Sequence, residues 1–290
     1  MRKILFFILL CPLFTSSQSL SPGRVAKIKS VTVHVSIEGS RETGTAFFIS
    51  ASGELLTCWH VIEPALHRDS LGNLVSISPI YIQSAEVAKT QVSIPAVFYK
   101  QLYISARSND YCLLSPVKPF TKPVIFFNPG NLNKVPEGQE VYTCGYPNSM
   151  PQPFISKGIL STKYIDSSTY VLKNGIQKKI NREVALLDLT LNKGNAGGPI
   201  IALGATINDD EVIGIADLLV TPFGQTSEEI QVISTAKATT ADTDDPGAAA
   251  MGIVLSSMKL VSSVINNSTH GISACLSLNQ FLNDIKLLKK

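Results

Sequence analysis

Three short segments of the sequence carry groups of the kind that acyl transfer requires. Residues 194–199 read Gly-Asn-Ala-Gly-Gly-Pro, and a loop this rich in glycine can turn two backbone N–H groups toward one developing oxyanion. His60 follows an apolar run, and histidine is the side chain that takes and returns a proton near neutral pH. Asp110 begins a second apolar run, where burial of an unpaired charge would be costly, so we expect it to have a partner.

Each segment alone also has an ordinary structural interpretation. The glycine-rich loop could be a β-turn, His60 could be a histidine in a core strand, and Asp110 could be a solvated loop residue. The three segments, however, follow one another with gaps of 50 and 86 residues, and three such segments at domain-scale spacing are unlikely to occur together by coincidence. The order and spacing therefore favour the chemical interpretation.

The loop resembles Gly-(Asp/Asn)-Ser-Gly-Gly-Pro, which carries the nucleophile in chymotrypsin/trypsin-like serine proteases, and the order histidine, aspartate, loop is also theirs. Residues 44–62, which begin Gly-Thr-Ala-Phe and end Leu-Leu-Thr-Cys-Trp-His-Val-Ile, resemble the segment that presents the general base. Residues 138–147 (Gly-Gln-Glu-Val-Tyr-Thr-Cys-Gly-Tyr-Pro) resemble the start of the second barrel in the HtrA (Deg) branch. The resemblance covers about residues 30–285.

The resemblance implies a role for each site residue. His60 would be the base, Asp110 would orient it, and the N–H groups of Gly194 and Ala196 would hold the oxyanion. Ala196 occupies the position of the nucleophile, and a methyl group cannot attack a carbonyl. For substrate binding, Thr190 would lie at the floor of the specificity pocket, and Ile215 and Ala216 on a strand whose edge pairs with substrate backbone. We also expect the strand before His60 to end on His60.

The expected fold is all-β, with two six-stranded antiparallel β-barrels of the chymotrypsin type and a C-terminal α-helix. Short runs of Val, Ile, Thr, Phe and Tyr, broken by Gly, Pro, Asn and Ser, predict many strands over residues 30–220. We expect the first barrel over residues 27–120 and the second over 135–277. Apolar residues at three- and four-residue steps predict a helix over 278–290. Residues 225–251 are small and polar, which predicts a long exposed loop inserted in the second barrel.

The N-terminus has the pattern of an export signal over residues 1–18. Arg2 and Lys3 precede an apolar run that extends to Phe14 and is too short to span a bilayer as a helix. We therefore expect a cleaved signal and a secreted or periplasmic protein, and removal of Arg2 and Lys3 lowers the formal charge from +3 to +1. Lipidation at Cys11 is a less favoured alternative, because the residue before it is the bulky Leu10.

Four cysteines remain after the predicted signal: Cys58, Cys112, Cys144 and Cys275. An oxidising compartment permits disulfides between them, with three connectivities open and Cys58–Cys112 the first pair to test. All four also lie in apolar runs, where a free cysteine behaves as a small hydrophobic residue. The spacing of Cys and His residues predicts no metal site, and we expect no cofactor.

Two function classes remain open. The chain is either an inactive protease homologue that binds polypeptide between the barrels, or a serine endopeptidase whose nucleophile has been replaced by Ala196, through engineering or recent loss. A purely structural shell without a ligand is a weaker third interpretation. The expected partner is a polypeptide substrate or protein ligand. The sequence contains no basic stripe with interleaved aromatic residues, which argues against a nucleic-acid partner, and it leaves the oligomeric state open.

Overall fold

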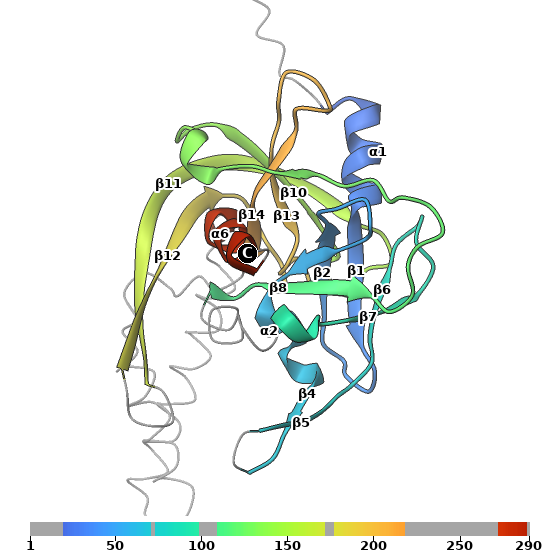
Figure 1. Cartoon of the computed structure of the whole chain (residues 1–290). Helices are drawn as coiled ribbons and strands as arrows, with labels where there is room; N and C mark the ends of the chain where they lie inside the picture. Colours follow the sequence, from blue (N-terminus) through green and yellow to red (C-terminus); the bar gives the residue numbers. More distant parts are fainter. Residues whose placement is uncertain (1–19, 71–72, 99–108, 172–176, 218–271, 289–290) are drawn as a thin grey trace, which may run out of the picture.

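The computed structural model of the protein describes residues 20–70, 73–98, 109–171, 177–217 and 272–288. These residues form mostly strands, arranged as two barrels (Figure 1). The predicted export signal, residues 1–18, and the predicted inserted loop, residues 225–251, lie outside the described residues. No helix in the described part of the chain combines the length and the apolar character needed to cross a membrane.

The first barrel is a closed antiparallel sheet in the strand order β1-β2-β3-β8-β7-β6. Its strands are β1 (Thr32–Ile37), β2 (Thr43–Phe48), β3 (Leu55–Thr57), β6 (Ile80–Gln83), β7 (Thr90–Ser93) and β8 (Cys112–Pro116). A small hairpin, β4 (Leu66–Arg68) and β5 (Leu74–Ile77), projects from the barrel after the short helix α2 (Trp59–Ile62) and the 3-10 turn η1 (Glu63–Ala65) (Figure 1). In β1 the β-branched residues Val33, Val35 and Ile37 alternate with polar ones and point into the barrel, as a half-buried strand requires.

The second barrel has the strand order β13-β10-β11-β12-β15-β14 and is closed by pairing of β13 with β14. Its strands are β10 (Glu140–Gly145), β11 (Phe154–Val171), β12 (Gln177–Asp188), β13 (Pro199–Ala202), β14 (Glu211–Asp217) and β15 (Ile272–Ser277). The two-residue strand β9 (Asn128–Pro129) adds in parallel to the start of β14, and two further 3-10 turns are η2 (Leu132–Lys134) and η3 (Pro147–Ser149). The predicted fold class, two six-stranded antiparallel barrels followed by a C-terminal helix, is confirmed.

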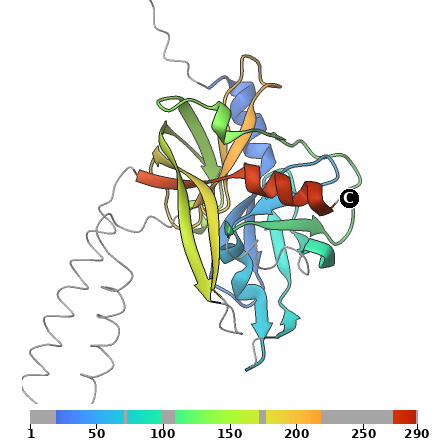
Figure 2. The ribbon, with the colours of Figure 1, turned by 60° about the vertical axis from the view of Figure 1, so that its left-hand side comes forward.

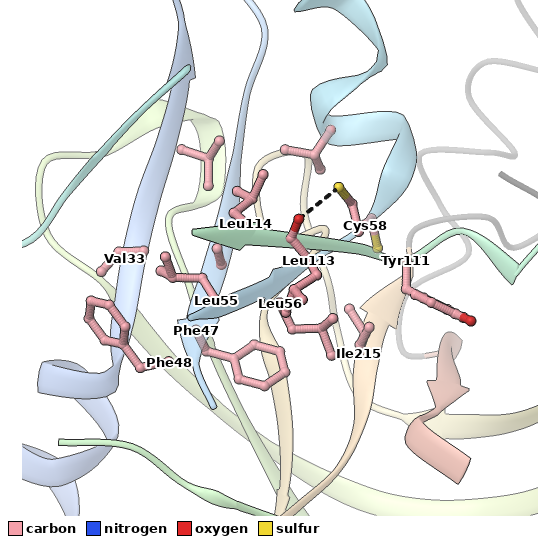
Figure 3. Packing of buried hydrophobic residues seen from close by; sticks show 14 of the residues in the cluster. Val33, Phe47, Phe48, Leu55, Leu56, Cys58, Tyr111, Leu113, Leu114 and Ile215 are labelled. Atoms are coloured by element: carbon pink, nitrogen blue, oxygen red, sulfur yellow. Dashed lines mark hydrogen bonds between the residues drawn. The ribbon is translucent and has the colours of Figure 1, made fainter. Parts of the chain in front are cut away.

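The two barrels share one hydrophobic cluster. It contains residues of the first barrel, such as Leu56 and Leu113, together with residues of the second barrel, such as Ile215 on β14 (Figure 3). All three side chains are at most 6% exposed. Burial of apolar surface stabilises by about 25 cal/mol per Å², so this cluster fixes the barrels against each other and thereby fixes any site built from both.

Two helices, one near each end of the described chain, also link the barrels. Helix α1 (Pro22–Val31) precedes β1 but binds the second barrel, because its Arg24 forms an ion pair with Asp210 (Nη2–Oδ1 3.0 Å, Nε–Oδ2 3.1 Å). Helix α6 (Leu278–Leu288) follows the last strand of the second barrel but packs Phe281 edge-on against Tyr111 of the first, with ring centroids 5.5 Å apart. Figure 2 shows α6 lying across the molecule. The helix that precedes the first barrel therefore packs on the second barrel, and the helix that follows the second barrel packs on the first.

The Arg24–Asp210 pair is nearly buried, which generates a prediction about stability. Asp210 is 1% exposed, and Arg24→Met would leave its carboxylate without the guanidinium; removing one partner of a buried pair costs about 3 kcal/mol. Lys27→Met is the matched control on the same helix: Lys27 donates to the neutral carbonyl of Ile207 and lies 4.7 Å from the centroid of the Phe127 ring, and the loss of both contacts should cost about 1.5 kcal/mol. Urea unfolding measures both. Equal losses would contradict the account, and Arg24→Met combined with Asp210→Asn should recover part of the stability.

Candidate active site

The structure brings His60 and Asp110 into direct contact. Nδ1 of His60 lies 2.6 Å from Oδ2 of Asp110, and the backbone N–H of His60 donates to Oδ1 at 2.9 Å. The Asp110 side chain is 8% exposed and the His60 side chain 38%. Both carboxylate oxygens are therefore occupied by one residue, so the ring is held in a fixed orientation with Nδ1 toward the carboxylate. The expected partnership of these two residues agrees with this geometry.

The charge around His60 favours its protonated form. Burial alone would lower the pKa of the imidazole, but the hydrogen bond and negative charge of Asp110, with smaller effects of Asp217 and Glu63, raise it above its ordinary value. The imidazolium is thus stabilised in place. This is the electrostatic requirement for a general base that must hold a proton during acyl transfer.

His60 does not end a strand, contrary to the expectation from sequence. Strand β3 ends at Thr57, and His60 is the second residue of α2. The physical reason lies in Asp110, whose backbone carbonyl accepts the N–H of Trp59 at 3.1 Å while its carboxylate accepts the N–H of His60. These N–H groups at the start of a helix have no intrahelical partner, and Asp110 provides one for each.

Only some of the backbone N–H groups in the 194–198 loop are hydrogen-bonded within the described chain. The N–H groups of Asn195, Gly197 and Gly198 donate to backbone carbonyls, each at 2.9 Å. Those of Gly194 and Ala196 donate to no acceptor within the described chain, although both residues are buried. The assignment of Gly194 and Ala196 as oxyanion donors, which needs two N–H groups without a partner in the chain, stays a prediction.

Thr45 on β2 fixes this loop, a role that the sequence analysis missed. Its N–H donates to the Ala196 carbonyl at 2.9 Å, and its hydroxyl donates to the Gly194 carbonyl at 2.6 Å. The same hydroxyl accepts the N–H of Tyr146 at 3.0 Å, and Thr57 donates to the Thr45 carbonyl at 2.6 Å. The first barrel thus determines the conformation of a loop that belongs to the second. The only signal in the sequence was the position of Thr45 in the Gly-Thr-Ala motif.

Cys58 lies close to the His60–Asp110 pair, a contact that the sequence analysis did not predict. Its thiol lies with the His60 ring nitrogens and the Asp110 carboxylate in a group whose donor atoms are within 4.8 Å of one another, and it donates to the Ala216 carbonyl at 3.4 Å. Burial, followed by the charges of Asp110 and Asp217, raises the pKa of Cys58 well above its ordinary value. A fully buried thiol with a raised pKa is a poor nucleophile and a poor metal ligand, because both roles need the thiolate.

The four cysteines that the structure describes are all buried free thiols. The disulfide alternative, with Cys58–Cys112 as the first pair, is therefore wrong for this structure, and the alternative of small hydrophobic residues is correct. Both Cys58 and Cys112 belong to the shared hydrophobic cluster. Both are fully buried, although the charge of Asp110 acts on each of them.

The expected substrate-pairing edge at Ile215 and Ala216 is not present. Ile215 pairs with Pro199 of β13 on one side and with Leu276 of β15 on the other. Ala216 also has both backbone groups occupied, since its N–H donates to the Gly198 carbonyl and its own carbonyl accepts from Gly197. The assignment of Ile215 and Ala216 to a free edge is therefore wrong, because closure of the second barrel uses both sides of β14.

Two further residues complete the description of the site. Thr190 is exposed just beyond the end of β12, and its place at a pocket floor stays a prediction. Asp217, the last residue of β14, is 1% exposed, and its charge acts on both His60 and Cys58. No sequence motif connects this aspartate with His60, since 156 residues lie between them.

Comparison with known proteins agrees with the fold. The sequence model of the trypsin-like peptidase domain matches residues 44–215, more than half of the chain. No curated protein sequence matches it. Among solved structures, the inactive form of a serine-to-alanine mutant of Rv3671c from M. tuberculosis is 15% identical with a TM-score of 0.53, and the alignment covers 94% of this chain and 95% of that one. At this identity the likeness supports the fold alone.

Two other solved structures are less similar in shape. Deg5 is 20% identical with a TM-score of 0.47, over 68% of this chain and 83% of its own. The active form of the Rv3671c protease from M. tuberculosis is 16% identical with a TM-score of 0.48, over 72% and 81%.

The conformation of the loop generates a prediction at Gly197. Its φ is +86°, and an added Cβ would lie 2.1 Å from the Thr45 carbonyl oxygen and 2.3 Å from the Thr57 hydroxyl, so Gly197→Ala should cost about 3 kcal/mol or more. Gly39→Ala is the matched control, because Gly39 has a φ of +78° but open space around it, and should cost about 1 kcal/mol. Denaturant unfolding compares them. Similar losses for the two variants would mean that the loop is not packed against Thr45 and Thr57.

Proposed function

Because the chain belongs to the trypsin-like peptidase family, we propose that it binds extended polypeptide at the site formed by His60, Asp110 and the 194–198 loop, and that Ala196 leaves peptide-bond hydrolysis lost or very weak. The observation that carries the proposal is the combination of an intact His60–Asp110 pair with two unused N–H groups in the loop. Ground-state binding of a peptide needs these groups and the surrounding surface but not the nucleophile.

The contacts of each residue indicate its role at the site. Asp110 holds the ring of His60 through Nδ1, which leaves Nε2 as the nitrogen that can exchange a proton with a reacting group. The N–H groups of Gly194 and Ala196 would donate to a peptide carbonyl oxygen, which would be the acceptor that they lack within the described chain. At residue 196 a serine hydroxyl would attack the carbonyl carbon, with His60 taking its proton. The Ala196 methyl group has neither a lone pair nor a proton to give, so the sequence of steps stops at binding.

The second candidate function is that of a serine endopeptidase in which this one residue has been replaced, by engineering or recent loss. The undisturbed contacts around Ala196 favour it. The Ala196 carbonyl accepts from Thr45, and the loop conformation depends on backbone bonds and glycines rather than on the side chain of residue 196. A serine hydroxyl would therefore enter a loop that already has the necessary shape.

Restoring the hydroxyl tests both candidates. Ala196→Ser should convert the chain into a serine protease that reacts with fluorophosphonate probes and cleaves unfolded casein, whereas the parent chain should do neither at a detectable rate. Loss of a triad nucleophile costs about 10⁶ in kcat, which sets the size of the expected difference. Labelling with a fluorescent fluorophosphonate, followed by gel electrophoresis, measures the reaction directly.

Controls at two histidines separate catalysis from general reactivity. In the Ala196→Ser background, His60→Ala should abolish labelling, while His67→Ala should leave it intact, because His67 is exposed on β4 and binds Ser78. A folded Ala196→Ser variant that neither labels nor cleaves would show that the site has changed beyond the nucleophile. Robust casein hydrolysis by the parent chain would mean that another nucleophile exists and that the assignment of Ala196 is wrong.

A further inference from the structure

A second pocket lies on the second barrel, apart from the candidate active site. It encloses about 430 Å³ where the residues after β9, the strands β12 and β14 and the start of α6 come together. Helix α6 packs against both of these strands (Figure 1). Pockets that bind small molecules have volumes of about 300–1,000 Å³, so this one has room for a ligand. None of its lining residues belongs to the His60–Asp110 pair or to the 194–198 loop.

Six of the residues that line this pocket are asparagine or glutamate. They come from four parts of the chain that are distant in sequence: Asn131, Asn133, Glu183, Glu211, Asn279 and Asn283. An amide side chain has an acceptor oxygen beside a donor nitrogen, and a carboxylate has two acceptor oxygens. The pocket, which we call the asparagine pocket, therefore offers hydrogen-bond donors and acceptors next to one another.

Glu183 fixes two of these amides. Its Oε1 accepts from Nδ2 of Asn133 at 3.3 Å, and its Oε2 accepts from Nδ2 of Asn279 and from the hydroxyl of Ser277, the latter at 2.9 Å. Because each amide nitrogen is turned toward Glu183, each amide oxygen is turned away from it. Neither Oδ1 has a hydrogen bond to a described residue, so both acceptors are oriented in advance and available to a ligand.

Glu211 and Asn283 add polar groups that the described fold does not use. Neither side chain has a hydrogen bond or an ion pair to a described residue. The carboxylate of Glu211 lies over the backbone of Gly130, where an added Cβ would be 2.6 Å from Oε2. The absence of a side chain at Gly130 thus leaves space for this carboxylate in the lining of the pocket.

The charges of the asparagine pocket are largely balanced. The charge of Glu183 is stabilised by its three donors, and the ammonium group of Lys134, which also lines the pocket, offsets the charge of Glu211. Pro129 and Leu282 add apolar surface. A ligand that suits this lining is neutral, donates and accepts hydrogen bonds at adjacent atoms, and has an apolar face.

We propose that the asparagine pocket binds a pyranose sugar ring. Each hydroxyl group of a pyranose both donates and accepts, and hydroxyls on neighbouring ring carbons can bond to the two ends of one amide or carboxylate. The C–H groups of the ring form an apolar face that can contact Pro129 and Leu282. An organic cation has donors only, so it would leave the amide N–H groups of Asn131 and Asn283 unused. The inference does not depend on the proposed function, since the two sites share no residue.

Ligand-observed NMR tests this assignment on the full chain. Saturation-transfer-difference spectra are recorded with the methyl glycosides of glucose, galactose, mannose and N-acetylglucosamine, and with maltotriose and chitotriose. The glycosides represent a free sugar, and the trisaccharides represent a glycan chain. At least one glycoside should bind with a millimolar dissociation constant, because Glu211 and Asn283 leave the pocket open to solvent. Tighter binding of a trisaccharide would identify a glycan as the source of the ring, and equal binding a free sugar.

Two variants in the pocket identify the residues responsible. Asn283→Ala and Glu211→Ala each remove a side chain that has no bond to a described residue, so the fold should not change. Each should weaken binding of the glycoside about fivefold, the effect of one lost hydrogen bond. Asn208→Ala is the matched control and should leave the affinity unchanged, because Asn208 is an exposed asparagine outside the pocket. Unchanged urea midpoints confirm that the three variants are folded.

Three results would overturn the proposal. Absence of saturation transfer to every glycoside and trisaccharide, with the chain folded, would exclude a sugar site. Equal affinity of the parent chain and of both pocket variants would place the sugar elsewhere. Saturation of butylammonium chloride without saturation of any glycoside would assign the pocket to cations. Polypeptide binding at His60 would stand in each case.

Discussion

The contact between Asp110 and His60 is the constraint on which the rest of the site depends. Asp110 has a φ of +55°, a left-handed conformation that aspartate tolerates better than most residues, and it turns its carboxylate back onto the N–H and Nδ1 of His60. The next residue, Tyr111, packs against Phe281 of α6. The position of the carboxylate is thus fixed by the C-terminal helix of the other barrel, and the start of α2 is fixed by the carboxylate.

The 194–198 loop of the second barrel is likewise held by residues of the first barrel. Thr45 of the first barrel bonds to the carbonyls of Gly194 and Ala196, and Gly197 can approach Thr45 and Thr57 only because it has no side chain. None of these contacts involves the side chain of residue 196. The conformation of the loop therefore does not depend on whether residue 196 is alanine or serine, which is why the proposed function treats binding and chemistry separately.

Much of the fold and part of the site could be predicted from the sequence, for reasons that differ between residues. His60, Asp110, Gly194 and Ala196 stand in local motifs, and such motifs can be read without knowledge of the partner segments. The environment of Ile215 could not be read in this way, because whether a strand edge is free depends on closure of a barrel by strands far away in sequence. For the same reason the sequence did not show that β3 ends before His60, or whether the four cysteines are paired or free.

The residues that were missed act only through long-range contacts. Thr45 and Asp217 are ordinary polar residues in apolar runs, and apart from the place of Thr45 in the Gly-Thr-Ala motif nothing local distinguishes them from residues of a solvated strand face. Their roles arise from burial at the seam between the barrels, where Thr45 binds the loop and the charge of Asp217 acts on His60. A sequence pattern contains the periodicity of each strand but not the way in which two barrels pack.

The amide proton shifts of Gly194 and Ala196 test the central claim most directly, namely that a trypsin-like site lacking only its nucleophile still receives a polypeptide. In ¹⁵N-labelled protein saturated with a peptide that binds it, both amide protons should move downfield, because each gains an acceptor that the described chain does not provide. The amide of Gly39, in a turn of the first barrel, should not move and serves as the reference. A bound peptide that leaves both loop amides unmoved would contradict the account.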